Sequence, residues 1–233
     1  MKTTTRKILI ATLFVAFLFL RLFTASPSVL LGGDYNKYLI MAKNFPYSTT
    51  INNQLATNHG PFFPYVVHFF TYIFHEDHVA VYFVSLLSGV VIFFVIYRLF
   101  MMLTGNFFIT FTVMLLYTLS VEFITAPERA IKETFAVMLM ISAIFYFIKG
   151  VKFRDKRAMA ASSALGGLTG LTVDYVIFLF PTFILAYFFF SHKKPNMRKL
   201  SFPGVRYAII PIIVTFLFYA AWNGVKYYEY STN

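Results

Sequence analysis

The chain has 233 residues, of which 59% are hydrophobic, 21% aromatic and 12% charged. A soluble domain carries roughly 25% charged residues, so this composition excludes an ordinary soluble enzyme and predicts an all-α, multi-pass integral membrane protein. The chain has no cysteine, which excludes disulfide and thiol chemistry, and its net charge of +11 does not indicate nucleic-acid binding because the basic residues cluster between apolar runs.

Apolar runs dominate the chain from its beginning to its end. They lie at 8–25, 61–74, 79–103, 107–123, 134–148, 158–173, 175–191 and 205–222. A perpendicular span needs about 20 apolar residues, with about 17 tolerated. The run 61–74 is only 14 residues long, begins at Pro61 and contains Pro64 and His68. This run is therefore the one whose crossing must be decided by charge.

Basic residues decide the topology. The densest clusters lie at 2–7, 149–157 and 193–206, and the positive-inside rule places all three in the cytoplasm. Counting back from 149–157, residues 26–78 begin and end on the outer side. The run 61–74 is therefore predicted to be an interfacial or re-entrant helix within an extracytoplasmic loop, 26–78, that carries juxtamembrane helices.

The resulting prediction is one transmembrane domain over residues 1–233. It has about seven spans, an N-terminus inside and a C-terminus outside, and we expect it in the cell (cytoplasmic) membrane. A cleavable signal peptide is an alternative for the run 8–25, although its length and Arg21 near its outer end argue against this.

Acidic residues gather on the predicted outer side. Eight of the nine lie there, namely Asp34, Glu76, Asp77, Glu122, Glu128, Glu133, Asp174 and Glu229, and only Asp155 lies inside. This asymmetry predicts that polar chemistry faces out. The alternative is that acids are simply tolerated on that side.

Asp34 stands in a Gly-Gly-Asp-Tyr turn about ten residues after the first apolar run. An ionisable group at the membrane edge indicates function, and a positioned carboxylate can act as general base on an acceptor hydroxyl. The alternative is that Asp34 only caps an amphipathic helix at 34–43.

A second group of polar residues follows in the same outer loop. His59 precedes Gly60-Pro61 and is predicted to contact substrate or to tune a pKa. The segment His75-Glu76-Asp77-His78 contains metal-ligand residue types, but its spacing matches no metal signature. We therefore interpret it as a solvated turn and predict no metal site.

The next outer loop contains Arg129, Lys132 and Glu133. Residues three or four apart share a helix face, and two cations at the level of the lipid headgroups suit a phosphate or pyrophosphate. Local salt bridging is the alternative. Ser162, Gly166 and Gly170 further along form a small-residue stripe, which is typical of close helix packing.

Together these segments resemble the GT-C superfamily of membrane glycosyltransferases, which use polyprenyl-phosphate-linked sugars and include protein O-mannosyltransferases and aminoarabinose transferases. The resemblance rests on Arg21 ending the first helix, then Gly-Asp34-Tyr with Tyr38 and Ala42, then His59-Gly60-Pro61 with Pro64. It continues with Arg129 four residues before Glu133 and with the Gly-rich stretch 164–172. The order of these motifs is more specific than any one of them.

The resemblance implies an inverting glycosyltransferase at the outer membrane face. Asp34 would be the base, Arg129 and Lys132 would hold the lipid phosphate, and Glu133 would orient a divalent cation or a substrate hydroxyl. His59 is a weaker substrate-binding candidate. The implied partners are a polyprenyl-phosphate-linked sugar and membrane lipid.

Three departures from the family pattern leave alternatives open. Tyr35 stands where many relatives have a second acid, Asp174 follows the Gly-rich stretch in place of a basic residue, and the chain ends after seven predicted spans. A fragment lacking a C-terminal region, a minimal enzyme and a non-catalytic subunit or scaffold therefore all remain. A lipid or solute transporter is less favoured, because the mid-span positions are nearly all apolar and no internal repeat is apparent.

Overall fold

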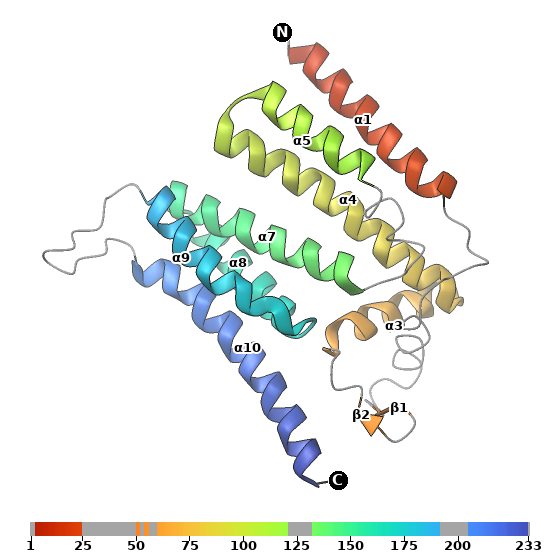
Figure 1. Ribbon diagram of the computed structural model, residues 1–233, viewed down its shortest axis with the longest axis vertical. Helices are drawn as coiled ribbons and strands as arrows, with labels where there is room; N and C mark the ends of the chain where they lie inside the picture. The colour runs from red at the N-terminus through yellow and green to blue at the C-terminus, as the bar shows by residue number, and fades with distance from the viewer. Residues whose placement is uncertain are drawn as a thin grey trace, which may run out of the picture. The chain divides into compact units, whose positions relative to one another are not determined.

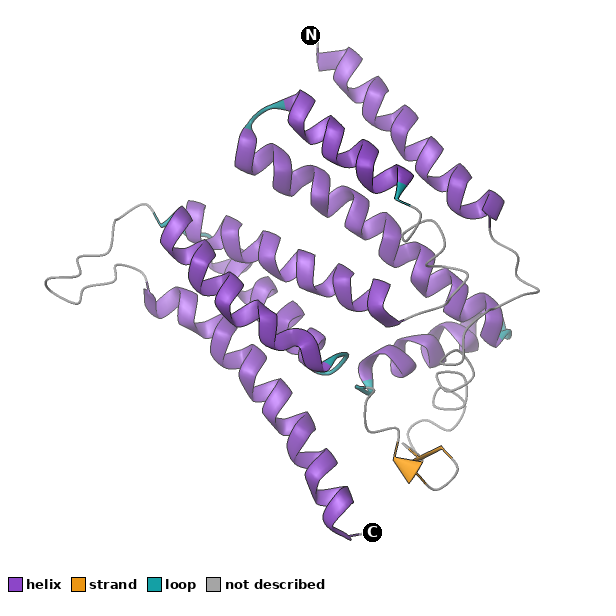
Figure 2. Cartoon of the chain, in the orientation of Figure 1, coloured by secondary structure: helices purple, strands orange, loops and turns teal. Residues whose placement is uncertain are grey.

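The structure is a computed structural model that describes residues 3–24, 50–51, 54–55, 60–120, 132–191 and 205–232 (Figure 1). Its helices are α1 (Thr3–Thr24), α3 (Phe62–Phe74), α4 (Asp77–Thr104), α5 (Phe107–Leu119), α7 (Lys132–Phe153), α8 (Lys156–Gly170), α9 (Leu179–Phe190) and α10 (Val205–Thr232). A 3₁₀ helix, η1 (Asp174–Phe178), runs directly into α9, and the short strands β1 (Thr50–Ile51) and β2 (Gln54–Leu55) pair with each other (Figure 2). The predicted all-α class is confirmed.

Within the described residues, each apolar run of the sequence overlaps a helix. Within the described residues, Asp77–Thr104, Lys132–Phe153 and Ala208–Val225 are long and apolar enough to cross a bilayer. Helix α3 has 13 residues and is therefore about 20 Å long, which is short of the roughly 30 Å hydrocarbon core. The chain is thus an integral membrane protein, while the count of seven spans stays a prediction.

The chain divides into two compact units. Unit 1 comprises Met1–Ile51 and Phe63–Met138, and unit 2 comprises Asn52–Phe62 and Leu139–Asn233. The single domain over residues 1–233 stays a prediction.

In unit 1, helix α5 packs against both α1 and α4 (Figure 1). Aromatic rings fill the contact, with the Phe17 ring centroid 5.2 Å from that of Phe93 and 5.7 Å from that of Tyr117. The turn between α4 and α5 is set locally, because Gly105 takes the left-handed φ of 62° that ends α4. Asn106 then caps α5 by accepting the backbone N–H of Phe108 at 2.9 Å.

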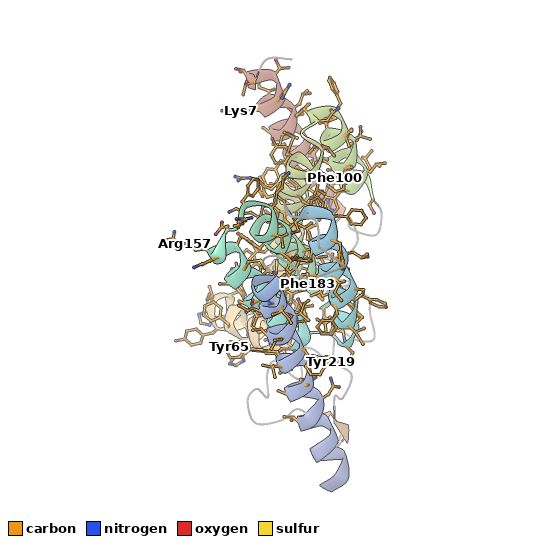
Figure 3. The ribbon with its side chains drawn as sticks, turned by 90° about the vertical axis from the view of Figure 1, so that its left-hand side faces the viewer. Lys7, Tyr65, Phe100, Arg157, Phe183 and Tyr219 are labelled. Atoms are coloured by element: carbon orange, nitrogen blue, oxygen red, sulfur yellow. The ribbon has the colours of Figure 1, made fainter. Side chains whose placement is uncertain are left out.

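Helix α3 has one packed face and one exposed aromatic face. The Phe70 and Phe74 rings each lie 5.0 Å from the Phe83 ring of α4. On the other side Tyr65, Phe69 and Tyr72 are exposed, and Figure 3 shows Tyr65 at the outside of the helix. Aromatic side chains with a polar tip are typical of the membrane interface, so this face supports the interfacial position proposed for 61–74.

Unit 2 is held together by close helix contacts. Helices α8 and α10 cross where Gly166 of the small-residue stripe faces Thr215, and an added Cβ at this glycine would overlap the Thr215 hydroxyl oxygen. The Ser162 hydroxyl donates to the Ala143 carbonyl oxygen of α7 at 2.9 Å. The predicted packing role of the stripe is therefore confirmed.

Candidate functional site

The predicted site residues are unevenly represented in the described part of the chain. Asp34, His59 and Arg129 lie outside the described residues, as does the predicted helix at 34–43. Lys132 and Glu133 begin α7. Of the proposed phosphate-binding pair, Arg129 and Lys132, the structure therefore describes only Lys132.

Lys132 is buried in the first turn of α7. Its exposed fraction is 8%, and Thr134 and Phe135 beside it are buried as well. The Phe135 ring lies 5.6 Å from the Phe63 ring of α3, so this turn of α7 packs on α3 within unit 1. Burial of a lysine side chain is costly unless polar or anionic groups surround its ammonium group.

Glu133 differs from Lys132 in its exposure. Its side chain is half-buried, because consecutive helical residues are rotated by about 100° about the axis. Glu133 also lies in the first turn, where the helix dipole favours a carboxylate. The two side chains therefore occupy neighbouring flanks of the α7 N-terminus.

Within unit 2, the segment that precedes α3 is joined to the end of the Gly-rich helix α8. The Gly60 N–H donates to the Thr172 carbonyl oxygen at 3.3 Å, and the Phe62 N–H donates to the Leu171 carbonyl oxygen at 3.2 Å. Gly60 is buried, and an added Cβ would overlap the Leu171 carbonyl group. The backbone at Gly60 can approach so closely only because glycine has no side chain.

Through this pairing Gly60, which follows His59 in the sequence, contacts Thr172, and Thr172 is two residues before Asp174. Asp174 is exposed in the first turn of η1. The predicted topology puts the beginning of 61–74 and the link at 172–174 on one side of the membrane, and the two hydrogen bonds support that arrangement.

The turn at His75–His78 has a simple structure. His75, Glu76 and His78 are exposed, as expected for a solvated turn. Among the described residues no group of three or more histidine or acidic side chains could hold a metal ion.

Residues 58–222 match the family of dolichyl-phosphate-mannose-protein mannosyltransferases, which is more than half of the chain. The chain belongs to this family. The matched region begins just before His59-Gly60-Pro61 and includes Arg129, Lys132 and Glu133, whereas Asp34 precedes it. Membership confirms the resemblance to the GT-C superfamily and supports, in general, glycosyl transfer from a polyprenyl-phosphate-sugar donor. No curated protein and no solved structure matches the chain.

One charged residue, Arg21, has a position that its place in the sequence did not predict. Arg21, near the end of the first helix, is 1% exposed and is among the largest fully buried side chains of the described residues. The available signal was an arginine close to the end of a long apolar run.

Proposed function

We propose that this chain is an inverting glycosyltransferase that moves a sugar from a polyprenyl-phosphate donor to an acceptor hydroxyl at the outer face of the cytoplasmic membrane. The observation that carries the proposal is the family match over residues 58–222, which contains the second outer loop and the Gly-rich helix in the expected order. The buried position of Lys132 adds to it.

The reaction requires a base on one side of the sugar and a cation on the other. Asp34 removes the proton of the acceptor hydroxyl, and the acceptor oxygen forms a bond to the anomeric carbon. The bond from that carbon to the phosphate oxygen breaks, and its electron pair leaves with the lipid phosphate. Attack from the face opposite the leaving group inverts the configuration at the anomeric carbon.

The cations stabilise the charge that develops on the leaving phosphate. Lys132 suits this role because its side chain is buried in a packed turn, where an electrostatic interaction is stronger than in water. Arg129, three residues earlier in the sequence, is the second proposed phosphate ligand. Glu133 orients a substrate hydroxyl or a divalent cation, and His59 is a further substrate contact.

The outer-face location rests on charge and on helix length. Residues 26–78 carry the proposed base, and the charge argument places them outside. Helix α3 is too short to span and exposes aromatic side chains, so it suits the interface near the donor headgroup.

The experiment compares wild type, Asp34→Asn and Asp34→Ala in a transfer assay with polyprenyl-phosphate mannose and a hydroxyl acceptor. Asparagine can still cap a helix but cannot take a proton. We expect Asp34→Asn to fold and to lose about 10²–10⁴-fold in transfer rate. Full transfer by Asp34→Asn would make this residue a cap.

The phosphate ligands have a separate test. Arg129→Ala should weaken donor binding by about 1.5–3 kcal/mol, the scale of a charge-assisted hydrogen bond. The control is Arg98→Ala, because Arg98 is an exposed arginine in the C-terminal part of α4. Unchanged donor affinity in the double variant of Arg129 and Lys132 would remove both from the proposed site. Transfer that appears only when a partner protein is added would favour the non-catalytic subunit.

A further inference from the structure

The turn that joins α7 to α8 in unit 2 has a strongly positive surface. Within residues 149–157 five side chains are basic and one is acidic, which leaves a net charge of +4. The one acid, Asp155, lies 3.4 Å from Lys149 Nζ and accepts two backbone N–H groups at the start of α8. Asp155 is therefore engaged within the turn, and the surface around it stays positive.

The other cations of this turn surround an exposed aromatic ring. Arg154, Lys156 and Arg157 are exposed, and Arg157 extends away from α8 (Figure 3). Phe153 between α7 and these residues is 59% exposed, and Lys152 Nζ lies 5.7 Å from the centre of its ring. Large apolar groups next to exposed cations are typical of segments that lie against a membrane surface.

Three of these cations occupy positions that local energetics disfavours. Arg154 has a φ of 53°, in the left-handed region where a side chain costs stability and glycine is the usual residue. Lys156 and Arg157 are in the first turn of α8, next to the positive end of the helix dipole. A negatively charged partner outside the turn would offset the repulsion among these groups.

The length of α7 places the turn at the depth of lipid headgroups. The helix has 22 residues and is therefore about 33 Å long, close to the roughly 30 Å of the hydrocarbon core. Phe153 is its last residue, so the cations that follow lie where the phosphates of a bilayer lie. The predicted topology puts this end in the cytoplasm, and the cytoplasmic leaflet is the one that carries anionic lipids.

We propose that Phe153, Arg154, Lys156 and Arg157 form a surface that binds anionic phospholipids of the cytoplasmic leaflet. The two guanidinium groups donate to phosphate oxygens, and the Phe153 ring contacts the upper part of the acyl chains. The surface is at the opposite end of α7 from Lys132, and it uses no residue proposed for sugar transfer. It therefore stands whether or not the chain transfers sugar.

The test titrates lipids onto the chain in a non-ionic detergent and measures bound lipid by native mass spectrometry. The probes are phosphatidylglycerol, which is anionic, phosphatidylcholine, which has a phosphate but no net charge, and diacylglycerol, which has neither. We expect phosphatidylglycerol to bind in preference to both. The preference should fall as ammonium acetate is raised from about 0.1 to 1 M, because the screening length falls from about 10 to 3 Å.

The decisive variants remove one charge or the ring. Arg154→Gln and Arg157→Gln should each lower the affinity for phosphatidylglycerol about fivefold and leave that for phosphatidylcholine unchanged. Arg154→Gly should lower it equally, although in detergent alone it should melt no lower than the wild type, because glycine accepts the left-handed φ. Phe153→Ala should weaken both phospholipids together, since the ring does not read charge.

Arg98→Gln is the matched control, because Arg98 is an exposed arginine of α4 that the topology also places on the cytoplasmic side. It should bind phosphatidylglycerol like the wild type. An equal loss in Arg98→Gln and Arg157→Gln would show that total charge alone sets the preference, and this would overturn the proposal. Equal affinity of the wild type for the two phospholipids would overturn it as well. Binding of polyglutamate in place of phosphatidylglycerol would assign the surface to an acidic protein instead of a lipid.

Discussion

The Gly60 N–H donates to the Thr172 carbonyl oxygen at 3.3 Å, which joins two segments that are more than 100 residues apart in the chain. The first contains the His-Gly-Pro motif and the second ends the Gly-rich helix. The two motifs that supported the family resemblance are therefore in direct backbone contact. Conversion of Gly60 into any larger residue would push them apart.

Gly60→Ala should destabilise the chain by about 1–3 kcal/mol, the usual cost of forcing a methyl group into packed backbone. The reason is the overlap of the new Cβ with the Leu171 carbonyl group. The measurement is thermal unfolding in detergent. Gly224→Ala is the matched control, because nothing lies within 4 Å of an added Cβ there. Equal stability of the two variants would mean that the pairing is dispensable.

Gly166→Ala should also destabilise the chain by about 1–3 kcal/mol, and here a second substitution should restore stability. The overlapping atom is the Thr215 hydroxyl oxygen, which is buried and makes no hydrogen bond, so Thr215→Ala loses little. The double variant should be more stable than Gly166→Ala alone, which a thermal double-mutant cycle would measure. Strict additivity of the two changes would contradict the contact between α8 and α10.

The turn between α7 and α8 predicts a dependence of stability on pH. Asp155 caps α8 by accepting the Arg157 and Ala158 N–H groups at 2.9 and 3.1 Å, and Lys149 Nζ lies 3.4 Å from its carboxylate. The hydrogen bond from Ala158 chiefly lowers the pKa of Asp155, with smaller contributions from Lys149 and Arg157.

Because the folded pKa is below the unfolded value, the carboxylate stabilises the fold above pH about 4, and this contribution is lost as the pH falls through the folded pKa. Asp155→Asn keeps a capping oxygen but does not titrate. The wild type should therefore be more stable than Asp155→Asn at pH 7, and the difference should shrink below pH about 4. Melting curves from pH 7 to pH 3 provide the measurement, and a difference that is constant over that range would contradict the prediction.

The predicted topology can be tested with single cysteines, since the chain has none of its own. Cysteines at Asn53 and His75 should react with a membrane-impermeant maleimide from the same, outer side. Arg157→Cys is the control for the inner side, because Arg157 is exposed at the start of α8 and extends away from it (Figure 3). Labelling of positions 53 and 75 from opposite sides would mean that 61–74 crosses the membrane.

The predicted site residues show which structural features a local sequence pattern can predict and which it cannot. Spacing placed Lys132 and Glu133 on one helix face in the second outer loop, and both residues lie in the first turn of α7. Spacing did not reveal that Lys132 is buried while Glu133 is half-exposed. That difference depends on the packing of Phe135 on Phe63, which belongs to another helix.

The sequence by itself determined the helices, because apolar runs in lipid must satisfy their backbone groups internally and therefore become helical. It also determined the caps at Asn106 and Asp155, since these act within three residues of their own position. Only the tertiary structure decided that Arg21 is enclosed by Phe17, Gly89 and Tyr117 and that Gly60 meets Leu171. Such contacts join distant segments through the shape of packed side chains, and no local periodicity encodes that shape.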